Sequence, residues 1–496
     1  MTEKRDLKDD RKFSAEEVNE GLLDFIRRSP NSFFAAENIA VELRAAGFEE
    51  LSESERWELR PGGRYLVRRN GSSLIAFRMP EAADADCGTG GVPAFHIYAA
   101  HPDSPAFKIK PNAEIRVEDK YLKLNVERYG GMLMSTWLDR PLSAAGRLVI
   151  RDGDGVSTVL VNLDRDLFVI PNLAIHMDRG VNESKSWNPQ NDMLPLFAGL
   201  PAGGGEDEDS AEAGKDRFLR LVASEAGVEP ENILDADLFL YNREPGTVFG
   251  AEREFIASPR LDDLQCLYAG LRGFLGASAD ASAGTDTEAG ADAPGGDIPV
   301  FCVLDNEEIG SGTKQGAASD LLKNTLFRIC GSEAFSAGAG EAGAPGISEA
   351  YYRALAKSFM ISADNAHGVH PNDASKADPT NRPVMNGGIV IKYTATMRYA
   401  TDALSGAVFR RICELAGVPC QTFANRSDIP GGSTLGTIAD TQVSVSTVDI
   451  GLPQLAMHSA YETAGARDTA YLAAAARTFF STRIRFGADG TVSIGK

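Results

Sequence analysis

One stretch decides the fold, Phe301-Cys-Val-Leu-Asp-Asn-Glu-Glu-Ile-Gly-Ser311, in which an apolar run leads directly into a cluster of acids. Residues 301–304 lack polar alternation, which predicts a buried strand. Asp305, Glu307 and Glu308 follow at once. Adjacent carboxylates repel each other unless a cation holds them, so the turn favours a divalent metal. One glutamate would then bind the ion while the other acts as a base toward water. Taken alone, the turn also fits a solvated acidic loop.

Three segments rich in metal-ligating residues follow other apolar, strand-like runs. His101 comes after residues 95–100, Asp364 after residues 359–361, and His458 after two runs between 448 and 457. In α/β proteins the carboxyl ends of the strands line the ligand crevice. We therefore expect these three residues to meet Glu307 and Glu308 at one edge of a sheet.

Asp262 opens the predicted helix that precedes the acidic stretch, where its carboxylate could bridge two cations. Two ions at a hydrolytic site need imidazoles and carboxylates with one bridge. A nitrogen and oxygen ligand set without thiolate suits zinc, with manganese or cobalt as alternatives. Asp103 lies two residues from His101, where it could orient that imidazole.

Each of these residues also has a plainer interpretation. A single histidine at a strand end is commonly a hydrogen-bonded structural residue, and an aspartate before a helix is commonly an N-cap. We interpret His96, in the middle of a predicted strand, as a core residue. The conjunction of the five ligand candidates with Glu307 favours the metal site.

The composition narrows the class of protein. A chain of 496 residues predicts two to three domains, and a net charge of −20 argues against nucleic acid or an anionic membrane surface as a partner. No secretory signal or membrane span is evident. Six scattered cysteines without a CxxC pair predict buried thiols and a cytoplasmic location.

The pattern of elements predicts an α/β protein with an insertion. Helices and strands alternate before residue 105 and after residue 250, whereas short alternating strands and Asp-Gly turns fill the region between. We predict a mixed-sheet α/β/α domain, residues 1–104 and 251–496, with a β-rich domain inserted at 105–250. Polar or small-residue segments predict loops at 81–92, 201–215, 276–297 and 331–347.

The sequence resembles the aspartyl aminopeptidase and vacuolar aminopeptidase I family over residues 20–480. The likeness rests on ten ordered motifs, among them Ala100-His-Pro-Asp-Ser-Pro105, Ser258-Pro-Arg-Leu-Asp-Asp263, Asp305-Asn-Glu-Glu-Ile-Gly-Ser311, Ser362-Ala-Asp-Asn-Ala-His367 and Pro453-Gln-Leu-Ala-Met-His-Ser459. Departures such as Pro102 remove none of the expected ligands.

The resemblance implies a role for each candidate. His101, Asp262 and Asp364 would hold one ion, and Asp262, Glu308 and His458 the other. Glu307 would be the general base. The substrate pocket would contain His367, His370 and Lys392. His176, on the inserted domain, would reach a neighbouring subunit in a dimer-based assembly of twelve chains.

We therefore predict a cytoplasmic, zinc-dependent aminopeptidase that removes an N-terminal residue, Asp or Glu, from peptides by means of water activated by two metals. A leucine-type preference is an alternative. Two further functions fit the same residues: a related deacylase or carboxypeptidase with the same metals, and an inactive assembly protein. Intact Glu307 and the five ligands argue against the last. No Gly-x-Ser-x-Gly elbow supports a serine hydrolase.

Overall fold

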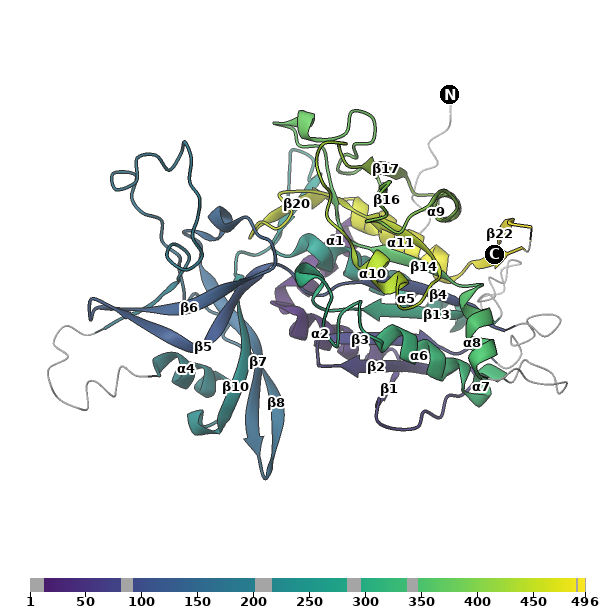
Figure 1. Ribbon diagram of the computed structural model, residues 1–496, viewed down its shortest axis with the longest axis horizontal. Helices are drawn as coiled ribbons and strands as arrows, with labels where there is room; N and C mark the ends of the chain where they lie inside the picture. Colours follow the sequence, from purple (N-terminus) through teal and green to yellow (C-terminus); the bar gives the residue numbers. More distant parts are fainter. Residues whose placement is uncertain are drawn as a thin grey trace.

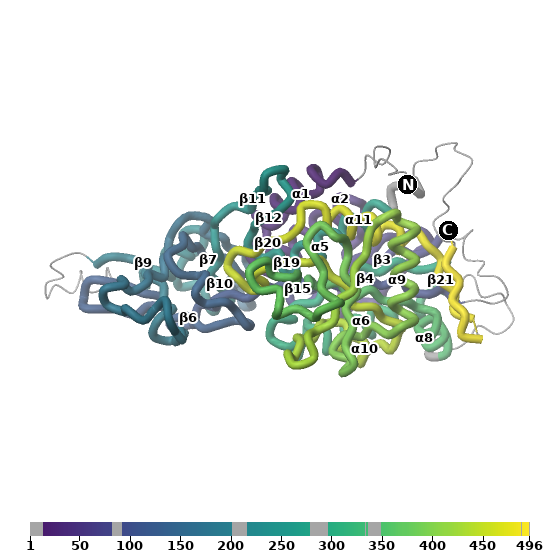
Figure 2. The backbone as a smooth tube through the Cα atoms, turned by 90° about the horizontal axis from the view of Figure 1, so that it is seen from above, coloured from purple at the N-terminus to yellow at the C-terminus, as the bar shows by residue number. Residues whose placement is uncertain are grey.

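The computed structural model describes residues 13–81, 92–200, 216–282, 296–336, 347–487 and 489–495. Two sheets dominate it, a large one between layers of helices and a smaller one that projects to one side (Figure 1). The view from above shows them as the two ends of an elongated molecule (Figure 2).

The large sheet has nine strands in the order β1-β2-β3-β13-β4-β14-β18-β16-β17. In chain order the bounds are β1 Glu49–Leu51, β2 Arg64–Arg69, β3 Ser73–Arg78, β4 Phe95–Ala100, β13 Ile298–Val303, β14 Phe359–Ala363, β16 Ile389–Tyr393, β17 Cys420–Ala424 and β18 Ser446–Gly451. The four central strands, β13, β4, β14 and β18, run parallel to one another. Their carboxyl ends therefore share one edge of the sheet, and this edge carries the candidate site.

Both faces of the large sheet are covered by helices. One face packs against α1 (Ala15–Arg28), α2 (Ser32–Ala45), α5 (Leu261–Ser282), α9 (Ala403–Ala416) and α11 (Asp468–Phe480). The other packs against α6 (Leu321–Cys330), α7 (Glu333–Ser336), α8 (Ile347–Leu355) and α10 (Leu435–Asp440). Strands buried on both faces are largely apolar, which explains why the apolar runs were visible in the sequence. The prediction of a mixed α/β fold is confirmed.

The second sheet, which we call the outer sheet, has six strands in the order β8-β7-β10-β5-β6-β9. The bounds are β5 Ala106–Val117, β6 Tyr121–Tyr129, β7 Leu142–Asp152, β8 Gly155–Asn162, β9 Leu196–Gly199 and β10 Ile233–Asn242. All pairs are antiparallel, and the residues along β6 alternate between buried and less buried. One face packs on its own apolar core with helix α4 (Arg217–Ala226).

Smaller elements complete the chain. A five-stranded sheet orders β11 (Thr247–Phe249), β12 (Phe255–Ser258), β20 (Glu462–Gly465), β19 (Pro453–Leu455) and β15 (Ala366–His367). Strands β21 (Arg483–Phe486) and β22 (Val492–Gly495) form a hairpin. Within the described residues, no helix has the length and apolar character needed to cross a membrane.

Some sequence-based boundaries were wrong. The strand expected at 301–304 begins at Ile298. Helix α5 continues through Ser282, so the loop expected from residue 276 begins later, because the alanines there extend the helix. Helices α7 and α8 occupy parts of the loop expected at 331–347. The remainder of the four expected loops falls largely outside the described residues.

Candidate active site

A tight turn carries the paired glutamates out of β13. Asn306 has a φ of 65°, in the left-handed region where asparagine is tolerated, and Glu307–Ile309 form one turn of 3₁₀ helix. The N–H groups of Glu307 and Glu308 each donate a hydrogen bond of 3.2 Å to the carboxylate of Asp103. The two glutamates are thereby fixed to the segment that follows β4.

His101 lies directly after β4 and is fully enclosed, with 1% of its surface exposed. Its Nδ1 is 3.1 Å from the carbonyl oxygen of Asp103, which orients the ring. Its Nε2 faces carboxylate oxygens of Asp262 and Asp364 at 3.6 and 3.8 Å. These three residues form a first group whose ligand atoms lie within 4.8 Å of one another.

A second group shares Asp262 with the first. The Nε2 of His458 lies 3.3 Å from Asp262 Oδ2 and 3.3 Å from Glu308 Oε2. Again the three ligand atoms lie within 4.8 Å of one another. His458 has a φ of 65°, so the loop after β19 takes an unusual backbone conformation to present this imidazole. The structure thus brings together all five residues that the sequence suggested as ligands.

Burial and crowding shift the protonation of these groups. Burial by itself would lower the pKa of His101, but the neighbouring carboxylates of Asp103, Asp262 and Asp364 raise it well above its ordinary range. Burial raises the pKa of Glu308 well above its usual range, and the nearby carboxylate of Asp262 adds to the shift. A cation between the carboxylates would remove this repulsion.

The donor set fits two divalent ions. Asp262 Oδ1 and Glu308 Oε1 are buried without a hydrogen-bond partner among the described residues. Unpaired buried oxygens are costly, so these atoms need a partner of another kind. Two imidazoles and three carboxylates, one of them shared, make up the two groups. Such a set suits zinc, manganese or cobalt.

Glu307 belongs to neither group, although charged residues of the site lie close enough to affect its protonation. Burial raises the pKa of its carboxyl group to about 8; His101 counteracts this effect, while Asp364 and Asp103 strengthen it. A carboxyl group with a pKa near neutrality is suited to accept and release protons.

The expected substrate residues lie beside the first group or at the surface. Lys392, on β16, is 3% exposed, and its Nζ is 3.5 Å from Asp364 Oδ2. The ring of His367 lies 6.2 Å from that of Phe423. His370 is exposed, and its Nδ1 accepts a hydrogen bond from the N–H of Asn372.

His176 belongs to neither metal group. It is exposed, on a turn closed by a hydrogen bond from Met177 N–H to the carbonyl of Ala174, in the segment between β8 and β9.

Sequence reasoning missed Glu462. Its carboxylate is 2% exposed and accepts hydrogen bonds from the N–H of Asp262 at 3.0 Å and from the N–H of His458 at 2.7 Å. It therefore fixes the backbone of the shared ligand and of the second imidazole. A glutamate only four residues after His458, at the start of β20 (Glu462–Gly465), was the available signal.

Comparisons with known proteins agree with this geometry. The family described as "Aminopeptidase I zinc metalloprotease (M18)" matches residues 25–480. A probable M18 family aminopeptidase 2 of Clostridium acetobutylicum is 44% identical and covers 93% of this chain and 98% of its own. The corresponding Pseudomonas aeruginosa PAO1 protein is 39% identical, over 94% of this chain and 98% of its own.

Solved structures resemble the whole molecule as well. A cryo-EM structure of the Ape4 and Nbr1 complex superposes with a TM-score of 0.84 at 33% identity, covering 95% of this chain and 87% of that chain. The structure of the S. cerevisiae mApe1 dodecamer superposes with a TM-score of 0.74 at 25% identity, covering 94% of this chain and 96% of that chain. From the family match, these relatives and the shared fold, we conclude that the chain belongs to the M18 family and is a metallo-aminopeptidase of the zinc metalloprotease class.

Proposed function

We propose that the protein removes an acidic N-terminal residue, Asp or Glu, from peptides, with two divalent ions and Glu307 as the general base. The observation that carries the proposal is the pair of three-residue ligand groups joined by Asp262. A shared carboxylate is the arrangement by which two ions are held at the short separation typical of hydrolytic two-metal sites.

The residues divide the chemistry between them. Bound divalent ions supply Lewis acidity, which polarises a carbonyl group and makes water more acidic. His101, Asp262 and Asp364 would hold one ion, and Asp262, Glu308 and His458 the other. Glu307 takes a proton from the attacking water and passes it to the leaving amine. Burial raises the pKa of its carboxyl group, which makes it a stronger proton acceptor than an exposed glutamate.

Lys392 gives a reason to expect an acidic substrate. Its ammonium group has three donors, and contact with Asp364 at 3.5 Å uses at most one of them directly. The remaining donors can bind the side-chain carboxylate of the substrate, and we assign His367 and His370 to the same substrate pocket. Burial of Lys392 strengthens such a pairing because few waters compete with it.

We further propose that residues 105–250 form a dimerisation domain in a homo-oligomer of twelve subunits, as in the mApe1 dodecamer. Leu173, Ile175 and Met177 are 56%, 46% and 75% exposed around His176. Apolar side chains gathered on an exposed loop favour contact with another protein surface. In the assembly, His176 would enter the active site of a neighbouring subunit.

Initial rates on Asp-, Glu- and Leu-p-nitroanilide test the activity, with the protein as isolated, after chelation, and after addition of Zn²⁺, Mn²⁺ or Co²⁺. We expect release from the acidic substrates, lost on chelation and restored by metal. Glu307→Gln should lower kcat by about 10² to 10⁴ while metal remains bound. The exposed Glu231→Gln serves as the control. Release from Leu alone would contradict the acidic preference.

Mixing two inactive variants tests the contribution of His176. His176→Ala and Glu307→Gln should each be slow alone. After dissociation and joint reassembly, some active sites combine an intact Glu307 with the intact His176 of another chain, so activity should return. A mixture as slow as its components would show that His176 acts within its own chain or not at all.

A further inference from the structure

One segment beside the outer sheet, residues 129–136, contacts both ligand-bearing loops, and we call it the brace. It begins at Tyr129, the last residue of β6, and reaches the turn with Glu307 and the loop with His458. Gly130 packs so closely against Glu308 that an added Cβ would lie 3.1 Å from the Glu308 Cβ. The backbone N–H of Leu133 donates a hydrogen bond of 3.0 Å to the carbonyl of His458.

The strongest contact of the brace is made by the hydroxyl group of Tyr129. It donates a hydrogen bond of 2.7 Å to Asp103 Oδ2 and accepts one of 2.8 Å from Asn306 Nδ2. The other end of the Asn306 amide is already occupied, because its Oδ1 accepts from Thr313 and Gln315 at 2.7 Å each. The amide orientation is therefore fixed, and its NH₂ group faces Tyr129.

Both partners of Tyr129 control the turn that carries Glu307. Asn306 begins the turn, with its left-handed φ of 65°. The carboxylate of Asp103 accepts the N–H groups of Glu307 and Glu308. A side chain from the outer sheet thus completes the partly buried network that holds the two glutamates, and a network whose polar groups are all paired favours one conformation.

We propose that Tyr129 is a positioning residue for Glu307, through which the outer sheet sets the geometry of the proposed general base. The kinetic part of this inference rests on the proposed function of Glu307. The structural part, that the hydroxyl orders the turn, is independent of it.

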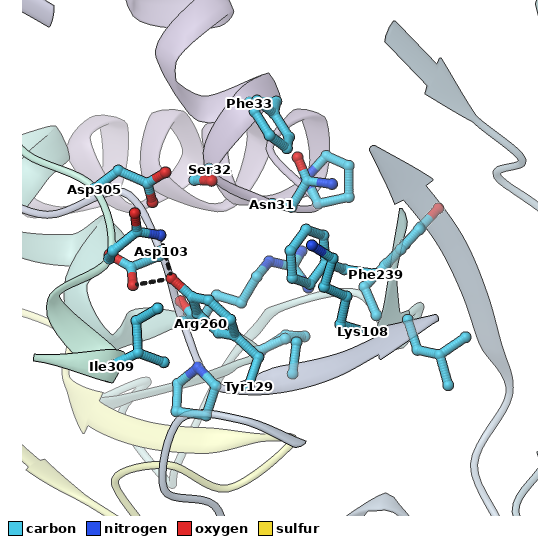
Figure 3. A pocket seen from close by; sticks show the side chains of 18 of the residues that line it. Asn31, Ser32, Phe33, Asp103, Lys108, Tyr129, Phe239, Arg260, Asp305 and Ile309 are labelled. Atoms are coloured by element: carbon cyan, nitrogen blue, oxygen red, sulfur yellow. Dashed lines mark hydrogen bonds between the residues drawn. The ribbon is translucent and has the colours of Figure 1, made fainter. Parts of the chain in front are cut away.

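The surroundings of Tyr129 make the role of its hydroxyl testable. The ring packs edge-on against Phe239, with 5.4 Å between centroids. Tyr129, Asp103 and Phe239 line a cavity of about 360 Å³ between the two sheets (Figure 3). Tyr129→Phe keeps the ring contact and removes only the hydroxyl. Tyr121→Phe is the matched control, because Tyr121 lies on the same strand and is 52% exposed.

Hydrogen exchange tests the structural part on the complete protein, with and without added Zn²⁺. In Tyr129→Phe, exchange of the amides in residues 304–311 should become about tenfold faster, as expected for loss of a buried hydrogen bond to a charged group. Tyr121→Phe should match the unaltered protein. Thr136→Val tests the contact of the brace with the His458 loop, because Thr136 Oγ1 accepts the N–H of Ala460 at 2.9 Å; residues 456–461 should exchange faster in this variant. Unchanged exchange of residues 304–311 in Tyr129→Phe would overturn the inference.

Kinetics test the positioning role. Tyr129→Phe should lower kcat about tenfold, change KM less than about twofold, and leave the bound metal unchanged. If the hydroxyl acts through Glu307, Tyr129→Phe should add no further loss to Glu307→Gln. A full additional tenfold loss in the double variant would overturn the role. Should Glu307→Gln remain fully active, the proposed base fails, while the exchange result still decides whether Tyr129 orders the turn.

Discussion

The two large sheets differ in how many of their faces are covered by other elements. Every residue of β4 and of β14 in the nine-stranded sheet is buried, because helices cover both faces. In the outer sheet, β6 alternates between buried and less buried residues, because only one face packs on an apolar core. The covered sheet can offer polar groups only at its edges, whereas the outer sheet keeps a broad face available.

This difference explains where each kind of polar group occurs. Parallel strands bring their carboxyl ends to one edge, so residues far apart in sequence, such as His101 and Asp364, meet there. Antiparallel neighbours alternate in direction and scatter their ends. The outer sheet accordingly contributes no ligand to either described group, but it braces both ligand loops through Tyr129 and Leu133.

The largest effect should come from the residue common to both groups. Asp262→Asn removes the shared carboxylate and should lower kcat/KM at least about a thousandfold, because metal-ion catalysis supplies several kcal/mol and about 1.4 kcal/mol is a factor of ten. Metal content should fall with it. Asp166→Asn serves as the control, because Asp166 lies just after β8 of the outer sheet and its side chain is 64% exposed. It should change neither kcat/KM nor metal content. Full metal content in Asp262→Asn would contradict the shared-ligand arrangement.

The sequence indicated the candidate ligands more clearly than the residues that hold them in place. Largely apolar runs mark the covered strands, and His101 and Asp364 come at or just after the ends of two of them, so their convergence could be inferred. Glu462 was missed because its role depends on the pairing of β20 with β12, where it lies opposite Ser258. Tyr129 was missed for the same reason, since nothing local indicates that β6 ends beside Asp103.

A matched pair of core variants should separate the two sheets. Leu148 in the outer core and Leu74 on β3 are both fully buried. Each change to alanine should cost about 2–5 kcal/mol in free energy of unfolding. Leu74→Ala should also lower kcat, because β3 pairs with β13 next to the glutamate turn. Urea unfolding measures the change in free energy of unfolding, and initial rates at low temperature measure the change in kcat. Equal effects of the two variants on kcat would show that the cores of the two sheets support the active site to the same extent.

Metal removal should affect the sheets unequally. Ions that bind only the folded chain stabilise it by about 2.7 kcal/mol at a hundred times the Kd. After chelation, hydrogen exchange should rise in residues 101–104, 304–311 and 456–462 and stay unchanged in β7, β8 and β10. Returning Zn²⁺ should restore the protection. A uniform rise across the outer sheet would mean that the ions stabilise the whole chain rather than the strand edge.

The smallest effect is expected at the seam between the sheets, at Asp237. Its carboxylate binds Lys108 and Arg147 at 2.8 Å each, and Arg147 also donates to the carbonyl of Asn70 in the turn between β2 and β3. Burial would raise the pKa of Asp237, but the hydrogen bonds from Lys108 and Arg147 lower it. A lowered pKa in the folded protein means that the carboxylate stabilises the fold above the ordinary value, about 3.9, and loses that effect as the pH falls through the lowered value.

Asp237→Asn should therefore cost about 0.5–1 kcal/mol at pH 7, since the aspartate is 30% exposed and solvent screens such pairs. The difference from the unaltered protein should shrink as the pH falls below about 4, because both proteins then carry a neutral side chain at this position. Thermal melting of both proteins at pH 7 and pH 3 measures this difference in stability. A difference that persists at pH 3 would show that shape rather than charge holds Arg147 in place. The two sheets would then be joined mainly by packing, including the guanidinium of Arg147 4.5 Å from the ring centre of Phe33 on α2.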